Sequence, residues 1–226
     1  AARSVSFTGT ADIRTTSTSS GSGSIDVQAG TGSITQSATS VLLSTGSTAQ
    51  ARLVAATDVT VGDIELTLGT VGITATAGSV LDADALVGSA NDADQDVTAA
   101  SLRLSAGTAV GATVNHLETT VGTLSARAAG GGIYVLEADG LIVDDVTVTA
   151  NRVLSTGVVT GSTVSDALQS DVRTTGGNGS IVLRTTAGGI TLNNGTAPGA
   201  AATDDVAVSA NGTGDVLVQA LGAGTD

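Results

Sequence analysis

The sequence contains no cysteine, tryptophan or methionine, and its 226 residues include one phenylalanine, one tyrosine and one proline. The absence of cysteine excludes a disulfide framework, thiolate metal ligands and a cysteine nucleophile. Large aromatic side chains normally fill the widest parts of a protein core. Because they are almost missing while 41% of the residues are hydrophobic, we expect a folded chain with a narrow core of small aliphatic side chains.

Positive charge is also scarce. The sequence has eight arginines and no lysine against 21 acidic residues, which gives a formal net charge of -13. The arginines are scattered singly, so no basic patch is available for a nucleic-acid backbone, and the acidic surface should repel anionic membranes. No apolar run is long enough to cross a bilayer. We therefore expect no nucleic-acid partner and no membrane insertion of this segment.

A short repeat supplies the most informative pattern. Each copy is a glycine turn followed by aliphatic residues at alternate positions, which is typical of a β-strand with one buried face. No segment has the 3.6-residue periodicity of a helix. The copies are Gly23–Val27, Gly62–Leu66, Gly131–Val135, Gly179–Leu183 and Gly214–Val218.

A longer repeat is also present, because residues 4–73 resemble residues 163–226. The segment Asp12-Ile13-Arg14-Thr15-Thr16 reappears as Asp171-Val172-Arg173-Thr174-Thr175, and the order of the following elements is kept. Units that cannot close a core alone must stack on their neighbours. We expect residues 1–226 to form one continuous solenoid segment, and the natural polypeptide to continue beyond Asp226.

These patterns predict an all-β fold, a parallel β-helix or β-solenoid. Its thin interior suits Val, Ile, Leu and Ala, and its corners suit Gly and Asn. With about 20 residues in each coil and strands about 4.8 Å apart, the segment would make roughly eleven coils and a rod about 50 Å long. An array of β-sandwich domains is the alternative, although sandwich cores usually hold an aromatic residue near their centre.

The chain also resembles the repeats of very large bacterial exoproteins of the filamentous-haemagglutinin type. The resemblance is carried by Gly78–Ala83, Asp96–Ala106, Leu117–Thr119, Val121–Leu124 and Gly132–Val135. It implies a right-handed β-helical shaft that is exported and is extracellular or on the bacterial cell surface. It also implies a role in adhesion, aggregation, biofilm matrix or extracellular filaments.

Asp92, Asp94 and Asp96 stand at alternate positions and resemble the opening of a calcium loop. An EF-hand loop needs glycine at its sixth position and glutamate at its twelfth, where this chain has Val97 and Arg103. We therefore expect a solvated loop here, and the alternative is a loose calcium site assisted by Asp82 and Asp84. No other cofactor is expected.

Catalysis is not expected. The paired acids Asp144-Asp145 and Asp204-Asp205 would point to opposite faces if they lie on strands, so neither pair would converge on one substrate. The single histidine, His116, has no evident Ser or Asp constellation around it in the sequence. The absence of lysine removes Schiff-base chemistry.

The sequence thus predicts a structural and adhesive shaft segment rather than an enzyme. Its expected partners are further copies, associating end to end or side by side, or a polysaccharide or protein receptor on a cell surface or in a matrix. The alternative is a carbohydrate-active or sugar-binding β-helix, which would need clustered acids in a groove and aromatic platforms for sugar rings.

Overall fold

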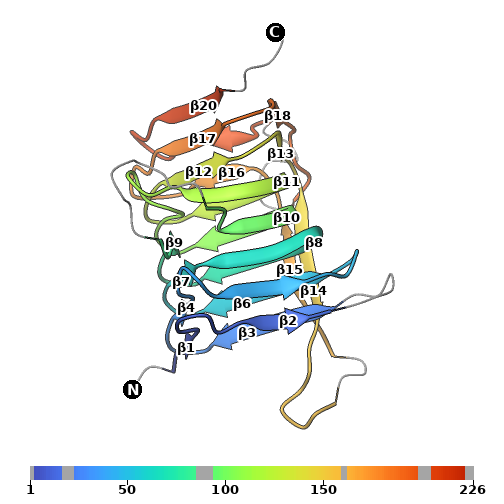
Figure 1. Ribbon diagram of the computed structural model, residues 1–226. Coiled ribbons are helices and arrows are strands. Elements are labelled where there is room, and N and C mark those ends of the chain that lie inside the picture. The colour runs from blue at the N-terminus through green and yellow to red at the C-terminus, as the bar shows by residue number, and fades with distance from the viewer. Residues whose placement is uncertain (1–2, 17–22, 85–93, 159–161, 198–204, 222–226) are drawn as a thin grey trace.

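The computed structural model describes residues 3–16, 23–84, 94–158, 162–197 and 205–221, and these residues form strands and turns without any helix. The strands stack one above another, from β1 near the N-terminus to β20 near the C-terminus (Figure 1). The all-β prediction is confirmed. The predominance of parallel strands in long sheets is compatible with a β-solenoid, while the number of coils stays a prediction.

Two parallel sheets form the stack. The smaller is four-stranded, with β1 (Val5–Ser6), β4 (Ile34–Thr35), β7 (Val59–Val61) and β9 (Val80–Asp82) in that order. The larger is fourteen-stranded. Its members are β2 (Ile13–Thr15), β3 (Ser24–Ala29), β5 (Val41–Ser44), β6 (Gln50–Ala55), β8 (Asp63–Ala75), β10 (Val97–Ala106), β11 (Leu117–Ala128), β12 (Ile133–Glu137), β13 (Leu141–Val143), β16 (Val172–Thr174), β17 (Ile181–Thr185), β18 (Ile190–Leu192), β19 (Val208–Ser209) and β20 (Val216–Ala220).

Each strand pairs with a strand about one coil away in the sequence. Val59 pairs with Val80, 21 residues later, whereas Ile181 pairs with Val216, 35 residues later. All ladders in these two sheets are parallel, so antiparallel pairing is confined, among the described residues, to one hairpin and the isolated bridge between Ala112 and Asn115. The strands expected from the short glycine repeat are confirmed in β3, β8, β12, β17 and β20.

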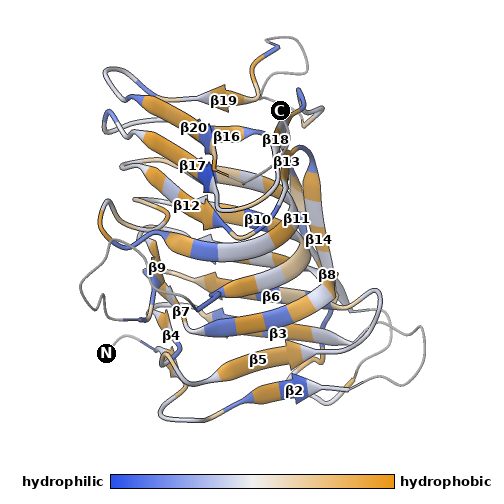
Figure 2. Ribbon diagram, turned by 45° about the horizontal axis from the view of Figure 1, so that its top comes forward, coloured by the Kyte–Doolittle hydropathy of each residue, from blue (hydrophilic) through white to orange (hydrophobic). Residues whose placement is uncertain are grey.

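Stacked aliphatic side chains form the core. Along β3, β6 and β8 alternate residues are buried and meet their equivalents in the next strand, as the alternating colours in Figure 2 indicate. The stacks are Ile25 on Ala51 on Val71, Val27 on Leu53 on Ile73, and Ala29 on Ala55 on Ala75. Complete burial of a side chain such as Leu53 stabilises the fold by about 1.5–3 kcal/mol relative to exposure. Small side chains at paired positions therefore fill a narrow core without aromatic rings.

The antiparallel hairpin is β14 (Val146–Asn151) with β15 (Thr163–Gln169). We call residues 146–158 and 162–169 the strap, because they run along one side of the stack and across several strands (Figure 1). Val146, Val148 and Ala150 are buried, so the alternation of β14 places its apolar face against the stack. The strap therefore covers outward-facing positions of strands that are distant in sequence.

Gly72 in β8 allows the strap to approach closely. A Cβ atom at this position would lie 2.8 Å from Cγ2 of Val148 and 3.1 Å from Oδ2 of Asp166, both in the strap. Contacts under 3.0 Å require one of the groups to move. Gly72 stands between Arg52 and Arg103 in the paired strands β6 and β10, so the smallest side chain lies where the strap crosses.

Ion pairs fix the strap to the stack. Arg52 donates from Nη1 to Asp26 at 3.1 Å and from Nε to Asp166 at 2.8 Å, and all three side chains are nearly buried. Arg152 of the strap donates from Nε to the same Asp26 at 2.7 Å. Arg103 donates from Nε to the carbonyl oxygen of Ala167 at 3.1 Å. These contacts join strands β3, β6 and β10 to a hairpin that lies 64 to 126 residues away in the sequence.

The long sequence repeat occupies two different settings. Val5 lies in β1 and pairs in parallel with Ile34, whereas its counterpart Val164 lies in β15 and pairs antiparallel with Ala150. Alternating side chains suit either kind of pairing, since strands in both have one buried face. The first segment of the repeat therefore lies in the stack in one copy and in the strap in the other, whereas later counterparts, such as β3 and β17, lie in the larger sheet in both.

Candidate acidic site

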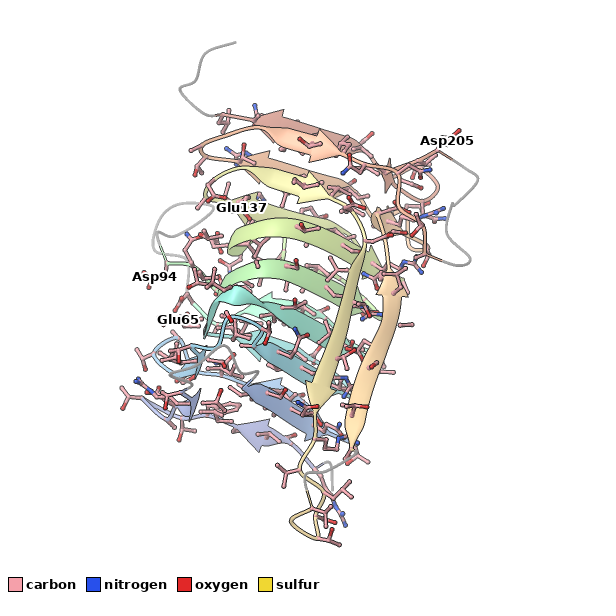
Figure 3. All side chains as sticks on the ribbon, turned by 90° about the vertical axis from the view of Figure 1, so that its right-hand side faces the viewer. Glu65, Asp94, Glu137 and Asp205 are labelled. Carbon is pink, nitrogen blue, oxygen red and sulfur yellow. The ribbon has the colours of Figure 1, made fainter. Side chains whose placement is uncertain are left out.

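An acidic groove of about 420 Å³ lies beside the start of β8. Asp63 and Glu65, at alternate positions of β8, share it with Asp84 after β9 and Asp94 before β10. Figure 3 shows Glu65 and Asp94 on the same side of the stack. The other lining residues are Ala38, Gly62, Thr67, Gln95 and Thr98. The groove thus gathers four carboxyl groups and presents no aromatic platform among the residues that line it.

Crowding of these carboxyl groups changes their ionisation. Partial burial, followed by repulsion from Glu65 and a hydrogen bond shared with it, raises the pKa of Asp63 to about 7. Neighbouring carboxyl groups of this kind are suited to holding a proton or a cation.

A second, buried cluster consists of Asp82 at the end of β9, Asp96 just before β10, and Glu118 in β11. Carboxylate oxygens of the three residues all lie within 4.8 Å of one another. Asp96 and Glu118 are 3% and 2% exposed, and the Glu118 amide donates to Oδ2 of Asp96 at 2.8 Å. Burial, and next repulsion by Asp82, raises the pKa of Asp96 far above its ordinary value. The shift favours the protonated form of Asp96 beside Asp82.

The buried cluster has the donor chemistry of a divalent-cation site. Calcium takes six to eight oxygen ligands, and carboxylates are its usual protein ligands. A cation bound between these three groups would displace the proton held by Asp96, because metal ligands must be deprotonated. Asp82, Asp96 and Glu118 are the residues that could hold it.

The predicted acidic loop is only partly brought together. Asp96 joins the buried cluster with Asp82, whereas Asp94 is exposed and lines the groove with Asp84. Asp92 lies outside the described residues. Sequence reasoning missed Glu118, which lies 22 residues after Asp96, about one coil later. This spacing is the only feature of the sequence that points to Glu118, because residues about one coil apart meet in a parallel stack.

Glu137, at the end of β12, is a third acidic group inside the protein. It is fully buried and accepts hydrogen bonds from the Thr119 hydroxyl at 2.7 Å and from the Val121 amide at 3.0 Å. Burial raises its pKa to about 7, although these hydrogen bonds, together with one from the Asp139 amide, act in the opposite direction. Glu137 therefore satisfies backbone groups between the part of β11 that pairs with β12 and the part that pairs with β13.

The paired acids take part in local hydrogen bonds. Asp144 accepts from Nδ2 of Asn193 at 2.8 Å, and Asp145 accepts from the amide and hydroxyl of Thr196. Asp205 is exposed and lies on the opposite side of the view from Glu65 and Asp94 (Figure 3). Its neighbour Asp204 lies outside the described residues. Asp144 and Asp145 therefore join two loops through these hydrogen bonds.

His116 is buried and stacks on Tyr134 with ring centroids 6.0 Å apart. Burial, and then the positive charge of Arg184, lowers the pKa of His116. The histidine is therefore neutral near pH 7 and packs as a ring. This contact brings together two of the few large rings in the chain.

Comparison with known proteins identifies no relative: no family model, curated protein or solved structure matches the chain. Within the described residues, the structure contains no helix of the length and apolarity needed to cross a membrane. Function must therefore be argued from the fold and from the acidic site.

Proposed function

We propose that this chain is a shaft segment of a giant secreted or cell-surface bacterial protein that acts in adhesion, aggregation, biofilm matrix or extracellular filaments. The observation that carries the proposal is the unbroken parallel path β2-β5-β8-β10-β11-β12-β17-β20. Hydrogen bonds between successive strands run along the stack, so every strand inside it has both edges paired. Such a stack holds its two ends at a fixed distance from each other.

The proposal includes closure of the ladders into a right-handed parallel β-helix. The continuous cluster of buried hydrophobic residues, which extends from Phe7 near the first coil to Leu183 in β17, supports one core shared by all coils. Repeat proteins of this kind gain stability from contacts between neighbouring units. The strap adds contacts between strands several coils apart, which should resist separation of the coils.

Stretching one molecule by its two ends tests the shaft. With partner residues 18 to 49 positions apart, loss of one coil should release about 60–175 Å of extended chain at 3.3–3.6 Å per residue. The proposal predicts a series of such steps, with the highest force at the step in which the strap detaches from the stack. Extension in one all-or-none event of a whole domain would contradict it and favour the sandwich alternative.

The adhesive part of the proposal needs a separate assay. A non-adherent bacterium that displays the chain on its surface should aggregate or attach to a polysaccharide or protein matrix, whereas cells displaying an unrelated acidic domain should not. Depolymerisation of acidic or neutral polysaccharides by the purified chain would instead support a carbohydrate-active protein. That result would overturn the assignment as a shaft without catalysis.

A further inference from the structure

Two arginines lie side by side on the outward face of the larger sheet. Arg127 in β11 pairs in register with Arg173 in β16, and the residues before and after each of them in its strand are buried. Ser105 in β10 and Ser209 in β19 continue the row on its two sides. We call these four residues the arginine row. The two arginines are 46 residues apart in the sequence, so only the register of the strands brings their charges together.

One edge of the Arg127 guanidinium has no acceptor. Its Nε and Nη2 atoms are buried and make no hydrogen bond, and Arg127 takes part in no ion pair among the described residues. The N–H groups of these two atoms form the fork with which arginine binds the oxygens of a carboxylate, sulfate or phosphate. Arg14 shows the same edge in use, because its Nε and Nη2 donate to Oδ2 of Asp12 at 3.2 and 2.7 Å. Buried donors without an acceptor are destabilising, so the fork of Arg127 favours an acceptor that the described part of the chain does not supply.

The charges around Arg127 also favour an anion. Burial, and next the positive charge of Arg173, lowers the pKa of Arg127, while Asp171 acts in the opposite direction. Asp171 is fully buried, and its carboxylate already accepts from the Gly195 amide at 3.1 Å and from the Ser170 hydroxyl at 3.3 Å. A guanidinium stays protonated at neutral pH. The row therefore holds two neighbouring positive charges, and the carboxylate that acts on Arg127 is engaged elsewhere.

We propose that Arg127 and Arg173 form a binding site for an oxyanion of the sulfate or phosphate class. The fork of Arg127 donates two hydrogen bonds to the ion, Arg173 adds a second positive charge, and the serine hydroxyls at both ends of the row are further donors. All four side chains are half-buried, and arginine has many rotamers, so the fork can meet an ion at the outer surface of the row.

The net charge of the chain decides between two sources of this ion. A formal charge of -13 should repel a polyanion at long range. It therefore favours a small free ion over an ester group on an acidic polymer. The site is independent of the proposed shaft function.

Titration with sodium sulfate, at an ionic strength held constant with sodium chloride, tests the site. The Nε–H resonance of Arg127 in a hydrogen–nitrogen correlation spectrum reports on the fork, and isothermal titration calorimetry measures the affinity. Arg127→Gln removes the fork and the charge, whereas Arg127→Lys keeps the charge without the fork. Arg14→Gln is the matched control, because the side chain of Arg14 is 55% exposed and already pairs with Asp12. Circular dichroism in chloride verifies that each variant folds.

The unaltered chain should bind sulfate saturably, with a shift of the Arg127 resonance. The affinity should fall at least about tenfold in Arg127→Gln, because two charge-assisted hydrogen bonds are lost, and by a smaller factor in Arg127→Lys. Arg14→Gln should bind sulfate like the unaltered chain.

Dextran sulfate, with uncharged dextran as its control, distinguishes the two sources of the ion. Equal or weaker binding per sulfate group than for free sulfate would support the free ion. Tighter binding that Arg127→Gln abolishes would support the same site and overturn the preference for a free ion.

Sulfate also stabilises folded proteins in general, because it is excluded from their surfaces, so a rise in the thermal midpoint does not count as binding. Absence of saturation, or an Arg127 resonance that does not move, would overturn the site. Equal affinity in Arg127→Gln and the unaltered chain, or an equal loss in Arg14→Gln, would do the same. Unchanged affinity in Arg127→Lys would contradict the role of the fork.

Discussion

Replacing Gly72 by alanine tests whether close contact between the strap and the stack stabilises the protein. The added Cβ atom would meet Cγ2 of Val148 at 2.8 Å and Oδ2 of Asp166 at 3.1 Å, so the strap must shift outward. Overpacking of this kind costs about 1–3 kcal/mol. Alanine also lowers the entropy of the unfolded chain, which offsets about 0.4–1 kcal/mol. The expected result is a net loss of about 1–2 kcal/mol.

Gly30→Ala is the matched control, because a Cβ atom at Gly30 would meet nothing within 4 Å. Urea unfolding measures the free energy of unfolding of both variants, and hydrogen exchange measures protection of the amides in β14 and β15. Gly72→Ala should lower both quantities, whereas Gly30→Ala should leave strap protection unchanged. Equal stability and equal protection of the strap amides in the two variants would show that close packing of the strap does not require glycine at position 72.

Further predictions concern buried charges. Arg52→Met should lower the free energy of unfolding by about 3–5 kcal/mol, since it removes the ion-pair partner of the nearly buried Asp166 and one of the two partners of Asp26. The exposed Arg14→Met should cost under about 1 kcal/mol in the same urea experiment. The pKa of Glu137 is raised from 4.5 to about 7, so its contribution to stability is full below pH 4.5 and is lost as the pH rises through 7. At about 1.4 kcal/mol per pKa unit, the free energy of unfolding falls by about 3 kcal/mol over this range. Glu137→Gln should flatten this part of the plot of stability against pH. An unchanged plot would contradict the raised pKa of Glu137. Calcium bound to the buried acidic cluster should raise the thermal midpoint of unfolding more at pH 8 than at pH 5, because calcium binding must displace the proton from Asp96. Calorimetry should show no calcium binding to the Asp96→Asn variant. Equal effects of calcium at both pH values would argue against this site.

Strand positions could be predicted from the sequence because alternation reports which side chains are buried. Ile25 and Val27, like Ile181 and Leu183, alternate with polar or half-buried residues and lie in strands as expected. Paired positions in successive coils carry similar aliphatic residues, so a stack was also predictable. Alternation says nothing about strand direction, however, so the alternating residues of β14 give no indication that this strand runs antiparallel across the stack.

The acidic site was predictable only in part because its members come from separate coils. A contiguous motif such as Asp92 to Asp96 is visible in a sequence, whereas the meeting of Asp82, Asp96 and Glu118 depends on the register of β9, β10 and β11. Coil lengths vary along the chain, so that register cannot be counted from a fixed period. The close approach at Gly72 was hidden for the same reason, since its contacts lie in the distant strap.

Cryo-electron microscopy of the purified chain tests the central claim most directly. Two-dimensional class averages should show slender rods with a repeat near 4.8 Å along the axis, the spacing of hydrogen-bonded strands, and a ridge along one side where the strap lies. Beads on a string, or compact particles without this axial repeat, would contradict the stacked architecture and the shaft function that depends on it.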